Sequence, residues 1–458
     1  MTVTPMAERL APWNCAPLTA PAFEVYTARD LDRIPQIQAL DPERRFAMKV
    51  VATVLPFRVN RYVTEHLIDW DNIPDDPLFQ LLYPQPGMLR PDHFERVASL
   101  LRRDAPQAEV ASVVAEIRHE LNPHPAGQLK LNIPRDETGQ PINGLQHKYR
   151  ETVLLFPSQG QTCHSYCTFC FRWAQFIGDK SLRIASAEAA RMHGYLRAHP
   201  EVTDVLITGG DPLVMKTAHL KAYIEPLLSP EFAHIRSIRI GTKALTFWPY
   251  RFLTEGEGQA LLDLFAQVVA SGKQLALMAH LNHWRELEPA PTQEAIARVR
   301  ATGAMIRAQA PLLAHINDDS DVWAKLWQRE VELGIVPYYM FVERDTGAHH
   351  YFKVPLARAW RIYRDALQRV SGLARTVRGP SMSAAPGKVE VLGVSRVAGQ
   401  RVFVLRFLQG RNPAWVDRPF FARFDPRATW LDELQPAFEP RFFWQDEFDA
   451  MLGREAAA

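Results

Sequence analysis

From residue 152 onward, the sequence alternates regularly between short apolar runs and longer helical patterns. The apolar runs are rich in β-branched residues and cover 152–157, 202–208, 235–241, 274–280, 304–309 and 335–342. Helical patterns separate them at 185–198, 217–228, 259–270, 293–301 and 322–333, and a sixth follows at 357–370. Near-continuous apolar strands that alternate with helices are typical of a parallel sheet covered by those helices. The sequence therefore predicts an α/β core of six βα units, two fewer than a complete eight-unit barrel has.

The segments on either side of this core have different patterns. Residues 1–145 are interrupted by prolines, as at 74–77 and 84–87, and contain amphipathic patterns at 94–101 and 110–121. Proline breaks a chain into short pieces, so we expect a mainly helical but irregular N-terminal region. The core should occupy 146–355, and 356–458 should form a small α+β C-terminal segment.

Composition excludes several classes of protein. Hydrophobic residues make up 47% of the chain and charged residues 23%, which is ordinary for a globular protein. The net charge of +2 is too small to indicate nucleic-acid binding. No apolar run approaches the roughly 18 residues of a membrane span, and the N-terminus has no apolar signal core. Four unevenly spaced cysteines do not form a disulfide framework, so we expect a cytoplasmic protein.

Three of the four cysteines fall within eight positions, at Cys163, Cys167 and Cys170. The spacing C-x3-C-x2-C can wrap three thiolates around one metal centre, and thiolates favour iron–sulfur clusters or zinc. A cubane of four irons held by three cysteines keeps one iron free, which suits chemistry better than simple electron transfer. Two alternatives remain, a zinc loop that recruits His164 and three unrelated buried thiols.

Polar clusters follow the apolar runs at the point where each predicted strand ends. In parallel βα proteins, the C-terminal ends of the strands carry the functional residues. The cysteine loop follows the first run. The clusters after the other runs are Thr208-Gly209-Gly210-Asp211, Gly241-Thr242-Lys243, His280-Leu281-Asn282-His283, Gln309 with Asn317-Asp318, and Glu343-Arg344-Asp345. We therefore expect these residues to share one rim of the sheet.

Further residues have chemistry of their own. Gly209 and Gly210 lack a Cβ and let the backbone approach a ligand, although a plain strand-to-helix turn explains them equally well. Arg172 can grip a carboxylate by two parallel hydrogen bonds, unless it is an ordinary surface arginine. Lys388 follows a Pro-Gly pair, and a lysine amine can bond covalently to pyridoxal 5′-phosphate (PLP), although most lysines are merely solvated.

The cysteine loop resembles the signature of the radical S-adenosylmethionine (radical SAM) superfamily. Residues 147–390 resemble the PLP-dependent lysine 2,3-aminomutase family within it. The resembling stretches span all six predicted units and the segment after them, and they are GLQHKYRETVLLF, CHSYCTFCFR, VLITGGDPL, IRIGTKAL, AHLNH, QAPLLAHIND, PYYMF and APGK. The resemblance implies a partial (βα)6 TIM-like barrel. It also implies an aminomutase, an isomerase that converts an α-amino acid into a β-amino acid by moving its amino group.

The resemblance assigns cofactors to particular residues. A [4Fe–4S] cluster would be held by Cys163, Cys167 and Cys170. S-adenosyl-L-methionine (SAM) would bind the open iron, and its amino group would be held by the loop that follows the second strand. The residues of that loop are Gly209, Gly210 and Asp211. Reduction of SAM needs an electron donor, for which a flavodoxin- or ferredoxin-like protein is expected.

The same resemblance implies how PLP and the substrate bind. Lys388 would be the catalytic lysine that bonds PLP, and Gln309 would lie near the PLP ring. Lys148 stands where the family has an arginine near the PLP phosphate, and a second phosphate arginine aligns with Thr152, so the phosphate contacts stay open. Arg172 would hold the carboxylate of a small amino-acid substrate.

The sequence departs from the family at the positions that bind the side chain of the substrate lysine. Of two aspartates that bind its ammonium group in the family, one aligns with Ala384 and the other with Arg344, which Glu343 and Asp345 flank. We therefore expect lysine to be a poor substrate. An inward Arg344 would favour an acidic or neutral side chain, whereas a one-residue shift would place Asp345 inward and restore a basic preference. The late cysteines of the family's structural zinc site are absent, so we expect no zinc.

Other interpretations of the same chain are a radical SAM enzyme without PLP, and an aminomutase that modifies a lysine of a partner protein. A third is an iron–sulfur electron carrier or structural metal module, which the SAM-type Gly-Gly-Asp and the length of the barrel argue against. The sequence leaves the substrate, the pathway and the oligomeric state open, a homo-oligomer included.

Overall fold

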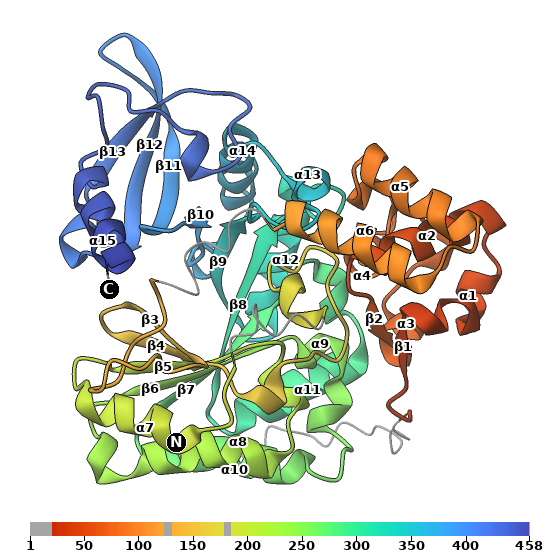
Figure 1. Ribbon diagram of the computed structural model, residues 1–458. Helices are drawn as coiled ribbons and strands as arrows, with labels where there is room; N and C mark the ends of the chain where they lie inside the picture. Colours follow the sequence, from red (N-terminus) through yellow and green to blue (C-terminus); the bar gives the residue numbers. More distant parts are fainter. Residues whose placement is uncertain (1–20, 123–130, 178–184, 458) are drawn as a thin grey trace.

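The computed structural model describes residues 21–122, 131–177 and 185–457 (Figure 1). A sheet of 11 strands runs through it in the order β13-β12-β11-β10-β9-β8-β7-β6-β5-β4-β3. Six neighbouring parallel strands match the six predicted apolar runs. They are β4 (Thr152–Leu155), β5 (Asp204–Ile207), β6 (Ser237–Thr242), β7 (Gln274–His280), β8 (Met305–Leu312) and β9 (Val336–Val342).

A helix follows each of these strands, as predicted. The helices are α7 (Ala189–Ala198), α8 (Thr217–Ile224), α10 (Gly258–Ala270), α11 (Ala290–Ala301), α12 (Ser320–Glu332) and α14 (Leu356–Leu367). In the described part of the chain, the two ends of the sheet do not pair with each other, so the barrel is open. The predicted α/β partial TIM-like barrel is therefore confirmed.

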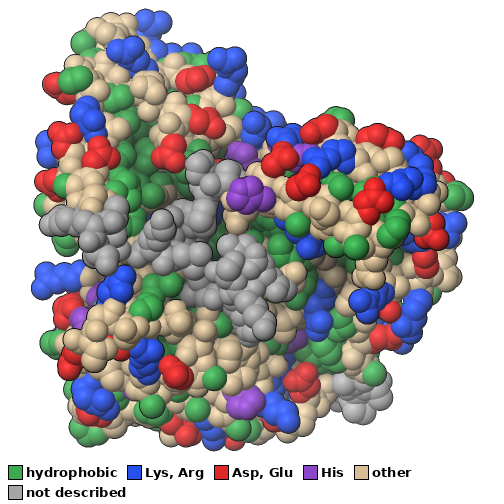
Figure 2. Space-filling model, viewed as in Figure 1, with side chains coloured by type: hydrophobic (Ala, Val, Ile, Leu, Met, Phe, Trp, Pro, Cys, Tyr) green, Lys and Arg blue, Asp and Glu red, His purple; other side chains and the backbone are tan. Residues whose placement is uncertain are grey.

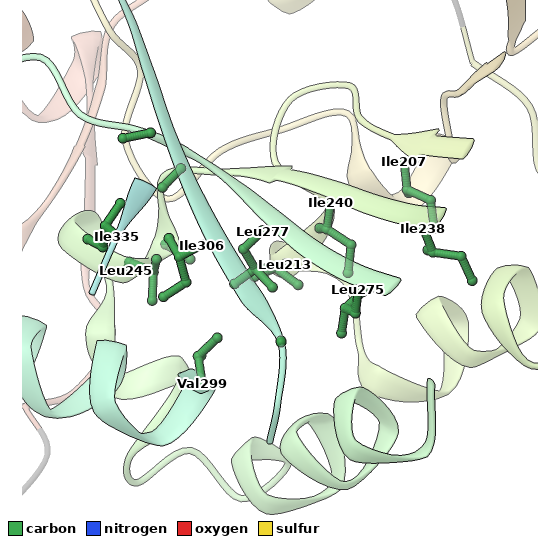
Figure 3. Close-up of a cluster of buried hydrophobic side chains, with 14 of the residues drawn as sticks. Ile207, Leu213, Ile238, Ile240, Leu245, Leu275, Leu277, Val299, Ile306 and Ile335 are labelled. Atoms are coloured by element: carbon green, nitrogen blue, oxygen red, sulfur yellow. The ribbon is translucent and has the colours of Figure 1, made fainter. Parts of the chain in front are cut away.

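The main core lies between the outer face of the sheet and these helices (Figure 3). On β6, Ile238 and Ile240 are fully buried and point toward the helices. Arg239 between them is only partly buried and lies on the opposite face of the strand. This follows from the two-residue period of a strand. Burial of each such side chain contributes about 1.5–3 kcal/mol, which makes the sheet a firm support for the loops at its rim.

The C-terminal part of the chain extends this sheet. β10 (Arg378–Ser383) is a seventh parallel strand beside β9. Three antiparallel strands follow, with a helix after them: β11 (Gly387–Val397), β12 (Gln400–Gly410), β13 (Pro419–Arg423) and α15 (Gln445–Ala457). Ser383 pairs with Lys388 across the β10–β11 turn, which places Lys388 near β9. At the other edge, β3 (Leu145–Tyr149) pairs antiparallel with β4.

The N-terminal region packs beside the barrel (Figure 1). Its longer helices are α2 (Pro42–Val54), α5 (Pro91–Arg102) and α6 (Gln107–Glu120), and the predicted amphipathic patterns coincide with α5 and α6. A two-stranded sheet of β1 (Val25–Thr27) and β2 (Arg58–Asn60) joins them, which the sequence did not indicate. The apolar core of this region includes side chains from barrel loops, namely Trp173, Phe247, Leu313 and Phe352. The N-terminal region therefore covers loops that follow the barrel strands.

Acidic and basic side chains are interspersed on the surface of the N-terminal helices, on the face that Figure 2 shows. In the N-terminal region, Arg90 pairs with Glu120 and Arg96 with Glu116, each at 2.5 Å. This mixture agrees with the small net charge of the chain. No helix of the described residues is long and apolar enough to cross a membrane.

Candidate active site

The cysteine loop lies directly after β4, on the rim where the sequence placed it. A single 3-10 turn, Ser158–Gly160, comes before it, and another, Trp173–Phe176, ends it. Cys163, Cys167 and Cys170 are free thiols and partly exposed. The backbone N–H of Cys170 donates to the carbonyl of Cys167 at 3.1 Å, which closes a tight turn between these two residues.

The surroundings of the three thiols favour their neutral form. Burial raises the pKa of Cys167 to about 12 and that of Cys170 to about 11. The pKa of Cys163 lies well above its usual range because of burial, the Asp211 carboxylate and the other two thiols. Metals bind thiolates, so ionisation of all three thiols near neutral pH requires a strongly cationic centre among them. Iron supplies such a charge, because a coordinating thiol loses its proton outright.

The described donors do not form a site for a single ion. In the described ranges, no three His, Cys, Asp or Glu side chains are arranged to hold one metal ion. His164, the fourth ligand of the zinc alternative, is buried, and its Nδ1 lies 3.9 Å from Asp211 Oδ2 without a hydrogen bond. That the three cysteines hold a [4Fe–4S] cluster stays a prediction.

The N-terminal region supports the cysteine loop through buried hydrogen bonds. Arg58 Nε donates to the carbonyl of Cys163 at 2.9 Å, and Tyr166 N–H donates to the carbonyl of Arg58 at 2.8 Å. Asn60 is fully buried, and its Nδ2 donates to Ser165 Oγ at 3.1 Å. Sequence reasoning missed Arg58 and Asn60, because they lie 105 positions before their partners and belong to no motif.

Gly209 and Gly210 permit a close approach between two segments of the protein itself. The N–H of Gly210 donates to the carbonyl of Gly160 at 3.0 Å. A Cβ on Gly210 would lie 2.3 Å from the Thr162 carbonyl oxygen. Gly209 has a φ of +148°, and its Cβ would meet the side chain of Gln161 at 2.2 Å. Glycine is therefore needed at both positions because the segment that leads into Cys163 packs directly against their backbone.

Asp211 joins the loops after two strands. Its carboxylate accepts hydrogen bonds from the hydroxyl of Thr242 and from the N–H groups of Leu213 and Lys243, at 2.8–2.9 Å. The side chain is only 2% exposed, and burial raises its pKa despite these donors. Asp211 also raises the pKa of Cys163 through its charge, which places it near that thiol. Its contact with the amino group of SAM stays a prediction.

Cationic side chains gather on the neighbouring part of the rim. Burial lowers the pKa of Lys148 well below its usual range, and Arg411, Arg344 and Lys388 lower it further. Burial also lowers the pKa of Arg172 to about 10, with Arg344 contributing. Within the described residues, no carboxylate pairs with Lys148, Arg172, Arg344 or Lys388. Such a concentration of unpaired positive charge is a site for anions.

Two of these cations share one aromatic ring. The guanidinium carbon of Arg172 lies 5.2 Å from the centroid of Phe171, and that of Arg344 lies 5.0 Å from it. Arg172 also lies 4.5 Å from the centroid of Phe156, and its Nη1 is buried without a hydrogen-bond partner. Arg344 therefore lies beside Arg172 at Phe171. Which of Glu343, Arg344 and Asp345 meets the substrate's side chain stays a prediction.

Lys388 is the second residue of β11, and its amine lies over aromatic rings of β9. Its Nζ lies 4.0 Å from the centroid of Tyr339 and 5.4 Å from that of Phe341. Burial, together with the charges of Arg239 and Arg378, lowers the pKa of its amine to about 7. A Cβ on the preceding Gly387 would lie 2.3 Å from the carbonyl of Gln409, so the turn needs glycine there. A partly deprotonated amine on a fixed strand is a nucleophile ready for a carbonyl group.

Gln309 pairs with His280 on the inner face of the barrel. The two residues are directly opposite on β8 and β7, and Gln309 Nε2 lies 3.0 Å from His280 Nε2. Burial lowers the pKa of His280 to about 4, with Lys243 and Arg172 contributing, so its ring is neutral. β8 continues to Leu312, three residues beyond the predicted end of the run at Gln309.

The remaining predicted residues follow β9. Glu343 is buried, its Oε1 has no hydrogen-bond partner, and burial raises its pKa well above the usual range. Asp345 is partly buried and makes no ion pair with Arg344 in the described part of the chain. Ala384 contributes its carbonyl, which accepts a hydrogen bond from Lys148 Nζ at 2.5 Å. Arg411, which sequence reasoning missed, hydrogen-bonds the Ala385 carbonyl next to it.

Comparison with known proteins places the chain among aminomutases. It is 31% identical over 398 residues to an Aquifex aeolicus protein with the provisional name L-lysine 2,3-aminomutase, a match that covers 87% of this chain and 92% of that protein. The L-lysine 2,3-aminomutase of Escherichia coli is 32% identical over 256 residues, covering 54% of this chain and 69% of that enzyme. No family model matches the chain.

Solved structures resemble the model only weakly. The crystal structure of Streptococcus suis SuiB bound to S-adenosylmethionine is 17% identical, with a TM-score of 0.36, and the match covers 62% of this chain and 59% of that one. That similarity is too low to carry an argument about this site. The sequence matches are stronger, because one of them extends over nearly the whole length of the relative at more than 30% identity. The chain therefore belongs to the L-lysine 2,3-aminomutase family.

Proposed function

We propose that the protein is a PLP-dependent radical SAM aminomutase that moves the amino group of a free α-amino acid from C2 to C3. The observation that carries the proposal is the position of Lys388. Its amine, with a pKa lowered to about 7, lies beside unpaired cations on a rim that also holds the three-cysteine loop. A nucleophilic lysine among anion-binding groups fits a carbonyl cofactor that carries a phosphate.

Each cofactor would be held by residues of this rim. Cys163, Cys167 and Cys170 would hold the cluster, and Asp211 would accept hydrogen bonds from the amino group of SAM. Lys388 would bond PLP, and Lys148 would lie near its phosphate. When bound, the cluster and SAM supply a radical that removes a hydrogen atom from C3, and PLP delocalises the unpaired electron while nitrogen migrates.

The protein's own contribution is orientation and exclusion of water. Arg172 would hold the α-carboxylate by two hydrogen bonds, and its buried Nη1 without a partner supports this role. The rings of Phe156 and Phe171 fix the guanidinium, because each lies within 5.2 Å of it. Gln309 and neutral His280 offer a donor and an acceptor beside the expected PLP ring without adding charge.

The test is an assay of reconstituted protein with free amino acids. Anaerobically purified protein would receive iron, sulfide, PLP, SAM and a chemical reductant in place of the expected flavodoxin- or ferredoxin-like donor. We expect a β-amino acid by mass spectrometry and loss of its formation in Lys388→Ala. SAM cleavage without PLP uptake would favour the alternative enzyme that uses no PLP. PLP uptake with poor turnover of every free amino acid would favour a lysine on a partner protein as substrate.

A further inference from the structure

One cationic side chain of the rim, Arg344, has no role in binding the proposed cofactors or the α-carboxylate. Arg344 is held inward over Phe171, and Arg172 and Lys148 are its electrostatic neighbours. No hydrogen bond or ion pair of its guanidinium is formed with the part of the chain that the structure describes. A guanidinium stays protonated at any physiological pH, so Arg344 places a full positive charge in the substrate region.

Neither acidic neighbour of Arg344 in sequence forms an ion pair with it in the described part of the chain. Burial raises the pKa of Glu343 well above its usual range, and its Oε1 has no hydrogen-bond partner. Asp345 is close enough to favour the charged form of Arg344, as is Tyr149, but it forms no ion pair with Arg344. The charge of Arg344 is therefore available to a ligand.

The proposed cofactors and the α-carboxylate leave Arg344 without a ligand. Arg172 would bind the α-carboxylate and Lys148 would lie near the PLP phosphate, whereas Arg344, which is close to both, has no counterpart among these groups. A second carboxylate on the substrate would pair with it.

We infer that Arg344 binds a carboxylate in the substrate's side chain, so that the enzyme acts on acidic α-amino acids. The inference rests on the proposed function and names the substrate class of the same site. Arg172 and Arg344 each lie about 5 Å from the centroid of Phe171, so both guanidinium groups border the same ring. A short dicarboxylic amino acid bound there would pair one carboxylate with each. For glutamate, the amino group would move from C2 to C3 and a hydrogen from C3 to C2, and 3-aminoglutarate has the same atoms as its substrate.

The experiment compares glutamate, its uncharged analogue glutamine, and lysine as substrates of the reconstituted enzyme. We expect kcat/KM to be highest for glutamate, about 100-fold above glutamine, because a site built for a charged group rejects an analogue that leaves its partner unpaired. Arg344→Gln should bring the two values together or invert their order. The matched control is Arg375→Gln, an exposed arginine in the segment before β10, at the other end of the strands from Arg344, which should leave the ratio unchanged.

A second readout needs no turnover. Calorimetric titration of glutamate and glutamine into protein that carries the cluster and PLP, without SAM or reductant, should show preference for glutamate, and Arg344→Gln should remove it. If kcat/KM were highest for glutamine or lysine, or if the ratio were unchanged in Arg344→Gln, the inference of an acidic substrate would be wrong. The proposed aminomutase activity would not be affected by either result. Failure of every amino acid to yield a β-amino acid would overturn the proposed function, and the inference with it.

Discussion

Lys388 Nζ and the guanidinium of Arg378 lie over the same aromatic ring, at 4.0 and 4.6 Å from the centroid of Tyr339. The π face of Tyr339 attracts both cations, yet the two like charges also repel each other. Burial, Arg239 and Arg378 all favour the neutral amine of Lys388, and its pKa falls to about 7. The arrangement keeps the lysine in place and partly deprotonated at neutral pH.

The first prediction is the pH dependence of PLP attachment. An amine reacts only when neutral, so below pH 7 the rate should rise about tenfold per pH unit and above it level off. An ordinary lysine with a pKa near 10.4 would instead show a rate that rises up to about pH 10. Borohydride trapping at each pH, followed by peptide mapping, measures the rate at Lys388. Label on another lysine, or a rate still rising at pH 9, would contradict the assignment.

The second prediction concerns Arg378. Arg378→Met removes a charge that lowers the pKa of Lys388, so the midpoint of PLP attachment should move to higher pH. The shift should be partial, because burial is the largest cause of the lowered pKa and remains in the variant. Arg375→Met is the matched control, since Arg375 is exposed and should leave the midpoint in place. An unchanged midpoint in Arg378→Met would mean that Arg378 does not act on the amine.

The third prediction concerns the cysteine loop. Anaerobic reconstitution should give about four irons per chain, as expected of one [4Fe–4S] cluster. Replacement of Cys163, Cys167 or Cys170 by Ala should abolish SAM cleavage, whereas Cys15→Ala, outside the described residues, should retain it. Iron and sulfide analysis together with the electron paramagnetic resonance spectrum of the reduced protein provide the measurement. Stoichiometric zinc in anaerobically purified protein would support the zinc loop instead.

The fourth prediction separates two glycine-to-alanine changes. Gly210→Ala places a Cβ 2.3 Å from the Thr162 carbonyl oxygen, so backbone must move beside Cys163. We expect a loss of about 3 kcal/mol in the free energy of unfolding and reduced iron content. Gly194→Ala, in the middle of α7 with nothing within 4 Å, should stabilise the protein by up to about 1 kcal/mol. Urea denaturation of both variants gives the free energies, and equal effects would contradict the role of Gly210.

Most of the barrel followed from the sequence because its strands are apolar and its helices periodic. β10 did not, because Arg378, Gly379, Pro380 and two serines give it no apolar signal, although it aligns with β9 and leads to Lys388. The rim residues were predictable in position, since polar clusters end the strands. The hydrogen bonds between these residues were not predictable. Asp211 accepts a hydrogen bond from Thr242, a contact that depends on the parallel register of β5 and β6.

The sequence alone also did not predict that the N-terminal region supports the cysteine loop. The fifth prediction concerns Asn60, which forms part of this contact. Asn60 Oδ1 accepts a hydrogen bond from Val63 N–H at the start of α3 (Arg61–His66). Its Nδ2 donates to Ser165 Oγ and to the carbonyl of Phe247, at 3.1 and 2.8 Å. Asn60→Ala removes the helix cap, which costs about 1 kcal/mol, and leaves a buried carbonyl unsatisfied, which costs about 1–3 kcal/mol more.

The effect of Asn60→Ala should extend to the cluster, because Ser165 lies between two of the cysteines. We expect the variant to unfold at lower urea concentration and to retain less iron after gel filtration. The matched control is Asn412→Ala, which removes a cap from an exposed turn of the C-terminal segment, where Asn412 Oδ1 accepts from Ala414 N–H. That variant should lose some stability and keep its iron. Equal iron loss in both variants would show that general destabilisation, and not the contact to the cysteine loop, releases the cluster.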